Sequence, residues 1–102
     1  MRYDVSVGLV IGAVLSKRSG RITYSDLGMI KTAVREYAPK CYVDFSRNSV
    51  YYAIEANSDC FMIEGGEIRL RDFYMENIGR VRSYFYEMLD EDVRHAIDAA
   101  LV

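Results

Sequence analysis

Two alternating runs of residues around Gly65-Gly66 constrain the fold of this chain most strongly. The segment reads CFMIE-GG-EIRLR, from Cys60 to Arg71. Alternation of apolar and polar side chains is typical of β-strands with one buried face. Two glycines in a row suit a tight two-residue turn, because both central residues of such a turn can require positive φ. The sequence therefore predicts a β-hairpin over residues 60–71.

The chain before the hairpin carries two apolar runs at helical spacing. The first, over residues 3–17, stops at Ser19-Gly20, and its apolar positions are Val7, Val10, Ile11, Val14 and Leu15. A short β-prone segment, RITY, comes next. The second run has Leu27, Ile30 and Val34 on one face. We expect a buried first helix and a second helix over residues 25–37, capped by Ser25-Asp26 and ended by Pro39.

Residues 46–56 fit two structures. Val50, Ala53 and Ile54 fit a helix that Asp44 or Ser46 would cap, whereas Val50, Tyr52 and Ile54 fit a strand. In the second case, residues 41–45, 49–56, 60–64 and 67–71 would form a four-stranded meander. Periodicity alone does not choose between them.

The segment from Phe73 to Leu101 predicts a long helical stretch, with a break near Asp90, whose carboxylate can cap a new helix. Its apolar positions are Ile78, Val81, Phe85, Met88, Leu89, Val93, Ile97 and Leu101. Four of them, Ile78, Val81, Phe85 and Met88, have the spacing of a helix-pairing seam. Packing within the domain and homodimerisation are the two interpretations of this seam.

Length and charge limit the class of protein. The chain has 102 residues, half of them apolar, which is enough for one domain over residues 1–102 with its own core. A net charge of −2 and a sequence pI of about 5.3 argue against a protein that coats phosphates indiscriminately. Residues 1–72 hold ten Lys and Arg against nine Asp and Glu, whereas residues 73–102 hold three against six. The acidity therefore belongs mostly to the C-terminal part.

Motifs for catalysis, metal binding or membrane insertion give no positive signal. The apolar stretch 5–15 is about half of a membrane span. Cys41 and Cys60 are too few for a four-cysteine zinc site, and free thiols suit a reducing cytoplasm. His95, near Glu91, has no second ligand cluster. We expect no enzyme activity, no metal and no cofactor. The absence of Gln fits a hot source.

Three segments in order carry a resemblance to a known family: GRITYSDLGMI (20–30), SRNSVYYAI (46–54) and CFMIEGGEIRLRD (60–72). Together they resemble a winged helix-turn-helix and are similar to the HARE-type winged helices. The resemblance implies an α+β fold of helix, short strand, helix, helix and β-hairpin wing, in which residues 46–56 are helical. Residues 5–72 would form this core, with residues 73–102 as a C-terminal extension. The segment 38–45 is longer than the turn of the family.

The resemblance also implies a DNA-binding site. In such families the third helix lies in the major groove and the wing touches the backbone or the minor groove. Arg can bind guanine and Asn adenine, while Ser and Tyr can bond phosphates. The residues carried over by position are Arg47, Asn48, Ser49 and Tyr52 on the third helix and Arg69 and Arg71 on the wing, and Lys40 lies nearby in the sequence. The wing arginines also have an alternative role, as surface ion pairs with Glu64 and Glu67.

Two functions follow as hypotheses. The first is a cytoplasmic, dimeric winged-helix protein that binds double-stranded DNA and regulates transcription. The second is an acidic winged-helix module that binds a protein, as an adaptor or as a viral or mobile-element protein acting on a host factor. The acidic hairpin tip at Glu64 and Glu67 favours the second, because phosphate repels carboxylates.

Overall fold

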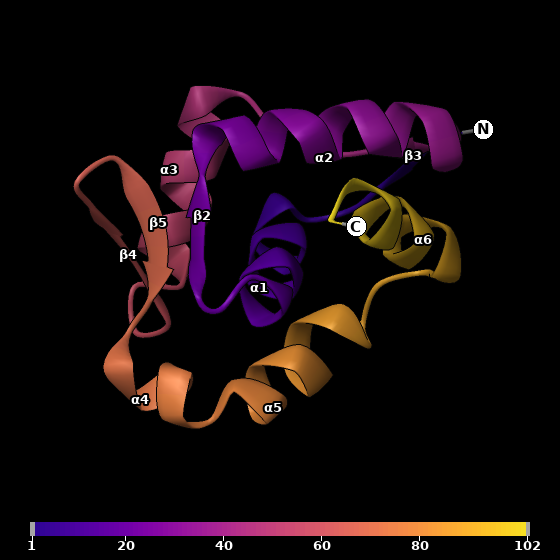
Figure 1. The fold of residues 1–102 in the computed structure, drawn as a ribbon. Coiled ribbons are helices and arrows are strands. Elements are labelled where there is room, and N and C mark those ends of the chain that lie inside the picture. The colour runs from indigo at the N-terminus through magenta and orange to yellow at the C-terminus, as the bar shows by residue number, and fades with distance from the viewer. Residues whose placement is uncertain (1, 102) are drawn as a thin grey trace.

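The computed structural model describes residues 2–101 and shows an α+β domain of six α-helices, a three-stranded antiparallel sheet and a short parallel pair of strands. In chain order the elements are β1 (Tyr3–Asp4), α1 (Val7–Lys17), β2 (Arg21–Thr23), α2 (Tyr24–Tyr37), β3 (Cys41–Tyr42), α3 (Arg47–Ala56), β4 (Phe61–Glu64), β5 (Glu67–Leu70), α4 (Asp72–Glu76), α5 (Ile78–Val81), the π-helix η1 (Arg82–Tyr86) and α6 (Glu91–Ala100). Figure 1 shows α1 in the middle, with the other elements around it.

The central position of α1 follows from its composition. Residues 10–15 are all buried, as expected for the apolar run. None of the helices described over residues 2–101 has the length and apolar character that a bilayer crossing requires. The predicted start of this helix at residue 3 is wrong. Tyr3 and Asp4 instead form β1, which pairs in parallel with β3. The Val5 amide donates to the Tyr42 carbonyl at 2.9 Å, so pairing with a distant strand overrides the local pattern.

The start of α2 is set by a capping box. Thr23 Oγ1 accepts from the amide of Asp26 at 3.2 Å, and the Asp26 carboxylate accepts from the amide of Thr23 at 2.8 Å. This reciprocal pair satisfies two amides that the first turn leaves without partners. The predicted helix is confirmed, but its cap is Thr23 rather than Ser25.

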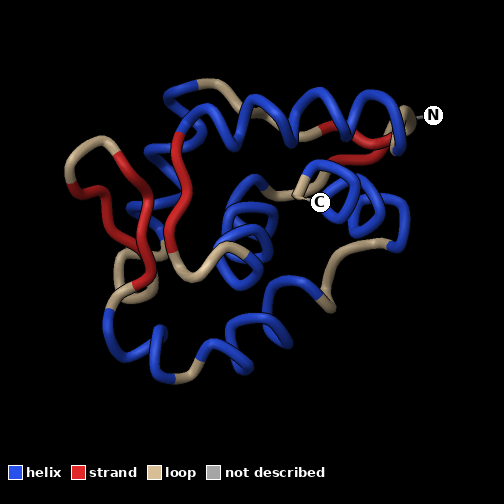
Figure 2. Tube along the Cα trace, in the orientation of Figure 1, coloured by secondary structure: helices blue, strands red, loops and turns tan. Residues whose placement is uncertain are grey.

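The predicted β-hairpin is confirmed. β4 and β5 pair antiparallel, with Ile63 opposite Ile68 and Glu64 opposite Glu67. Gly65 and Gly66 form the turn with φ values of 59° and 79°, which non-glycine residues rarely adopt. The RITY segment supplies β2, which pairs with β5, so the sheet order is β2-β5-β4 (Figure 2).

Residues 47–56 form the helix α3, so the meander is excluded. The Ser46 hydroxyl accepts from the Ser49 amide and caps α3. Val50 and Ile54 are buried on one side of the helix, which is the arrangement that the helical pattern required.

The expected long C-terminal helix is not one helix. It is divided into α4, α5, η1 and α6. A non-helical stretch that ends at Asp90 separates η1 from α6, so the break lies near the expected position. The Asn77 side chain donates to the carbonyl of Phe73 at 2.8 Å and ends α4. α6 then folds back onto α2 and adds Val93, Ala96 and Ile97 to the same core as α1 (Figure 1).

The predicted helix-pairing seam is not present as a surface. Val81 and Phe85 are 2% and 3% exposed, and both belong to the core of their own chain. Ile78 is half-buried, and only Met88 of the four is strongly exposed. Packing on α1 therefore explains the apolar spacing of this segment.

Candidate nucleic-acid interface

The outer face of α3 carries three of the seven residues that the sequence singled out. Arg47, Asn48 and Tyr52 are exposed, while Val50 and Ile54 face the core. Tyr51, adjacent to Tyr52, is also exposed. An arginine, an asparagine and two tyrosines thus share one solvent-facing surface. These side chains can contact base edges and phosphates.

Ser49 has a different position from the other predicted residues. Its hydroxyl is bonded to the carboxylate of Asp44 and to the hydroxyl of Ser46, within the network that begins α3. The Asp44 carboxylate also accepts from the Ser46 amide at 2.8 Å. Hydrogen bonds from Ser49 and Ser46 lower the pKa of Asp44, so this carboxylate stays charged. Ser49 therefore positions the helix start.

Arg47 lies over the ring of Tyr51, with its guanidinium carbon 6.0 Å from the ring centroid. Hydrogen bonding to Tyr24 and Arg47, with the charge of Arg47, lowers the pKa of the Tyr51 phenol. This stacking restrains a long side chain at the exposed start of α3. A restrained arginine loses less conformational entropy when it binds a ligand.

The two wing arginines are already engaged. Arg69 Nη1 lies 3.3 Å from Oε1 of Glu64, across the hairpin, as the ion-pair alternative predicted. Arg71 Nε donates to the carbonyl of Ser58 at 2.6 Å and fastens the base of the hairpin to the loop after α3. Both charges serve the hairpin, and the tip carries Glu64 and Glu67.

A cationic pocket lies beside the start of α3. It has a volume of about 520 Å³ and lies between α2, β3 and Ser46. Arg2, Lys31 and Arg35 line it, against one carboxylate, Asp44. Within residues 2–101 these three cations form no ion pair. Lys40 is exposed in the turn before β3 but does not line the pocket.

Sequence reasoning missed these three cations. Lys31 and Arg35 are four residues apart, so they share one face of α2, and that spacing was the available signal. Arg2 comes to the pocket only because β1 pairs with β3, which local sequence does not show. The cationic face is therefore broader than the third helix alone.

In the part of the chain that the structure describes, no three His, Cys, Asp or Glu side chains lie close enough together to hold a metal ion. His95 Nε2 lies 3.7 Å from Glu91 one turn away, on the exposed side of α6. Cys41 and Cys60 are both buried and unbonded to each other. Burial raises the pKa of each thiol.

Neither a protein-family model, nor a curated protein, nor a solved structure matches the chain. The geometry of α2, α3 and the hairpin is therefore the basis for inferring a function.

Proposed function

We propose that this protein is a winged-helix protein that binds double-stranded DNA and regulates transcription. Two features support the fold assignment. The elements follow the order α1, β2, α2, α3, β4 and β5, and the sheet order β2-β5-β4 places the hairpin beside the strand that leads into α2. A short two-residue strand, β3, occupies the long segment before α3.

The cations around the start of α3 carry the proposal. Arg47 stands at the exposed start of the helix, and the pocket with Arg2, Lys31 and Arg35 adjoins Ser46, the residue just before it. Phosphate contacts supply affinity and orientation, and contacts to base edges supply specificity. In this proposal, Arg47 and Asn48 reach base edges while Lys31 and Arg35 hold the backbone.

The hairpin has a small part in this mode of binding. Its Arg69 is paired with Glu64, and the carboxylates at the tip disfavour contact with phosphate. The overall net charge of −2 agrees with a narrow contact surface instead of a generally basic protein. Binding is thus assigned to α2 and α3.

A homodimer remains part of the proposal, because two α3 helices related by a two-fold axis would read a symmetric operator. Its contact surface is not the segment containing Val81 and Phe85, which are buried in the core. Light scattering measures the oligomeric state directly.

The second candidate is a protein-binding winged helix that does not bind DNA. The charge of the hairpin favours this candidate. Arg69 is neutralised by Glu64, and Glu67 is a further carboxylate at the tip. A basic partner surface would complement this tip.

Fluorescence anisotropy of labelled random duplex DNA tests the proposal. The protein is titrated at low and at moderate salt, and log K is plotted against log salt. We expect a negative slope of about 0.9 for each phosphate that the protein neutralises. Absence of binding at low salt rejects DNA binding and favours the protein-binding candidate, whose partner is then sought by affinity capture.

A further inference from the structure

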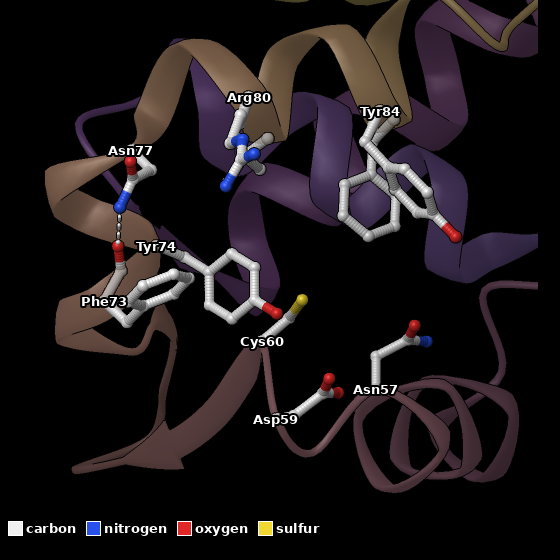
Figure 3. Close-up of a pocket in the computed structure, with 10 residues that line it drawn as sticks. Asn57, Asp59, Cys60, Phe73, Tyr74, Asn77, Arg80 and Tyr84 are labelled. Atoms are coloured by element: carbon white, nitrogen blue, oxygen red, sulfur yellow. Dashed lines mark hydrogen bonds between the residues drawn. The ribbon is translucent and has the colours of Figure 1, made fainter.

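A second pocket lies at the opposite end of α3, between the loop after the helix and the segment α4 to η1 (Figure 3). Its volume is about 360 Å³. Pockets for small molecules start at about 300 Å³ and are mostly apolar with a few polar groups. This pocket has that composition, and it is separate from the cationic pocket beside Ser46.

Aromatic rings form much of the wall. Phe73 and Tyr74 meet edge to face with centroids 5.2 Å apart, and Tyr84 and Phe85 do the same at 4.8 Å. Phe73 and Tyr84 are nevertheless 59% and 63% exposed. Large aromatic side chains are costly to leave in water, and their open faces offer stacking surfaces for a planar ligand.

Two groups of opposite charge border the same space. Figure 3 shows Arg80 on one side and Asp59 on the other, with the Tyr74 ring between them in this view. Within the described residues, neither side chain forms an ion pair. Arg80 supplies hydrogen-bond donors only, and the Asp59 carboxylate supplies acceptors only.

The polar lining also contains fixed groups. Asn77 donates to the Phe73 carbonyl at 2.8 Å, and Asn57 donates to the Ala53 carbonyl at 2.9 Å, so both amides are held in place. Cys60 raises the pKa of the Tyr74 phenol to about 12, so its hydroxyl stays neutral near pH 7. Two of the polar side chains that line the pocket, Asn57 and Asn77, are thus fixed.

We propose that this pocket binds a planar heteroaromatic base of the purine type, as a free base or nucleoside. The ring would stack on Phe73 and Tyr84. Acceptors on its edge would receive hydrogen bonds from Arg80, and donors on its edge would bond to Asp59.

Other ligand classes fit the pocket less well. A purely apolar molecule would cover Arg80 and Asp59 without satisfying them, which costs free energy. A simple carboxylate or phosphate would match Arg80 but face the like charge of Asp59. A purine carries ring faces, acceptors and donors together, so it satisfies both charged groups and the aromatic wall. The inference does not depend on DNA binding.

Titration of the ¹⁵N-labelled protein with guanosine and with adenosine tests the proposal. ¹H–¹⁵N correlation spectra report the side-chain amides of Asn57 and Asn77 and the backbone of α4 and α5. We expect saturable shifts confined to these groups with at least one nucleoside. Indole, a bicyclic ring without an acceptor on its edge, is the control ligand and should bind more weakly.

Variants locate the site. We expect Arg80→Leu to lower nucleoside affinity about tenfold, which is the loss for one charge-assisted hydrogen bond. Asp59→Asn should also lower it, whereas Arg82→Leu, a change of another exposed arginine two residues away, should not. Lack of saturable shifts, equal binding of indole and guanosine, or equal effects of Arg80→Leu and Arg82→Leu would each overturn the proposal.

Discussion

The ring of Phe85 occupies the space where a side chain at position 12 would be. A Cβ atom on Gly12 would lie 2.3 Å from Cγ of Phe85, closer than any real contact. The ring also meets Phe61, with centroids 5.4 Å apart. Gly12 therefore lets the π-helix η1 approach the backbone of α1 and carry Phe85 into the core.

Gly12→Ala should destabilise the protein. Although alanine favours a helix more than glycine by about 1 kcal/mol, the added methyl forces Phe85 out of its position. Overpacking of a core costs about 1–3 kcal/mol. Urea denaturation should show a lower midpoint.

Gly28→Ala is the matched control for this change. Gly28 is also helical, on the exposed face of α2, and a Cβ there meets nothing within 4 Å. We expect this variant to be as stable as the parent or more stable, because only the helix propensity changes. Equal losses in both variants would contradict the packing role of Gly12.

The capping box of α2 gives a second prediction. Thr23→Ala removes the hydroxyl that accepts from the Asp26 amide and should lower the free energy of unfolding by about 1 kcal/mol. Ser25→Ala, two residues on, should change it by much less, because Ser25 is exposed and no cap bond involves it. Thermal denaturation followed by circular dichroism distinguishes the two, and a larger loss for Ser25→Ala would return the cap to that residue.

Asp98 makes the stability depend on pH. Burial raises the pKa of this carboxyl, but hydrogen bonds from Lys17 and from Tyr86, the latter at 2.9 Å, outweigh burial and lower it. A carboxyl with a lowered folded pKa stabilises the protein above its unfolded pKa of about 3.9. That stabilisation is lost as the pH falls through the folded pKa.

Asp98→Asn should therefore cost about 1 kcal/mol at pH 7, the modest loss expected for a part-exposed pair. The difference from the parent protein should shrink as the pH falls below 4. Glu87→Gln, an exposed carboxylate outside the ion pairs of the described residues, should show no comparable difference. A loss for Asp98→Asn that is constant with pH would point to packing instead of charge.

Arginine variants show whether DNA contacts α3 or the hairpin. Arg47→Ala should weaken binding to a selected operator by about 1–3 kcal/mol and relax specificity, because in our proposal Arg47 contacts base edges. Arg69→Ala should have little effect, since Arg69 is paired with Glu64. Anisotropy titrations at one salt concentration make the comparison. The reverse order of effects would move the contact to the wing.

Lys31→Gln combined with Arg35→Gln addresses the backbone contacts. We expect weaker binding to all sequences alike, with the salt slope smaller by about 0.9 for each lost phosphate contact. Sequence preference should not change. If the double variant still binds duplex DNA with the salt slope of the parent protein, the cationic pocket is not part of the interface.

Local chemistry explains which elements the sequence predicts well. The hairpin at Gly65-Gly66 depends on turn residues and alternation, and α2 depends on periodicity and Pro39, all of which lie within a few residues of one another. The helix over 46–56 needed the resemblance, because Val50 and Ile54 fit both a helix and a strand.

Contacts between distant segments explain what the sequence did not predict. Tyr3 is drawn out of the helical run by pairing with Cys41, and Phe85 turns toward Gly12 through a π-helical segment. The candidate site shows the same division. Arg47 and Asn48 follow from the helix, whereas the place of Arg2 near Lys31 follows from the pairing of β1 with β3.

The position of α6 has a consequence for synthesis of the protein. α6 covers α2 and buries Ile97 completely, yet α3, the hairpin, α4, α5 and η1 all come between them in the chain. Until α6 is made, the part of α2 that it covers stays open, and contacts between distant parts of a chain form late. During synthesis we therefore expect part of the apolar face of α2 to be exposed to water, as a surface prone to aggregation, until the residues of α6 emerge.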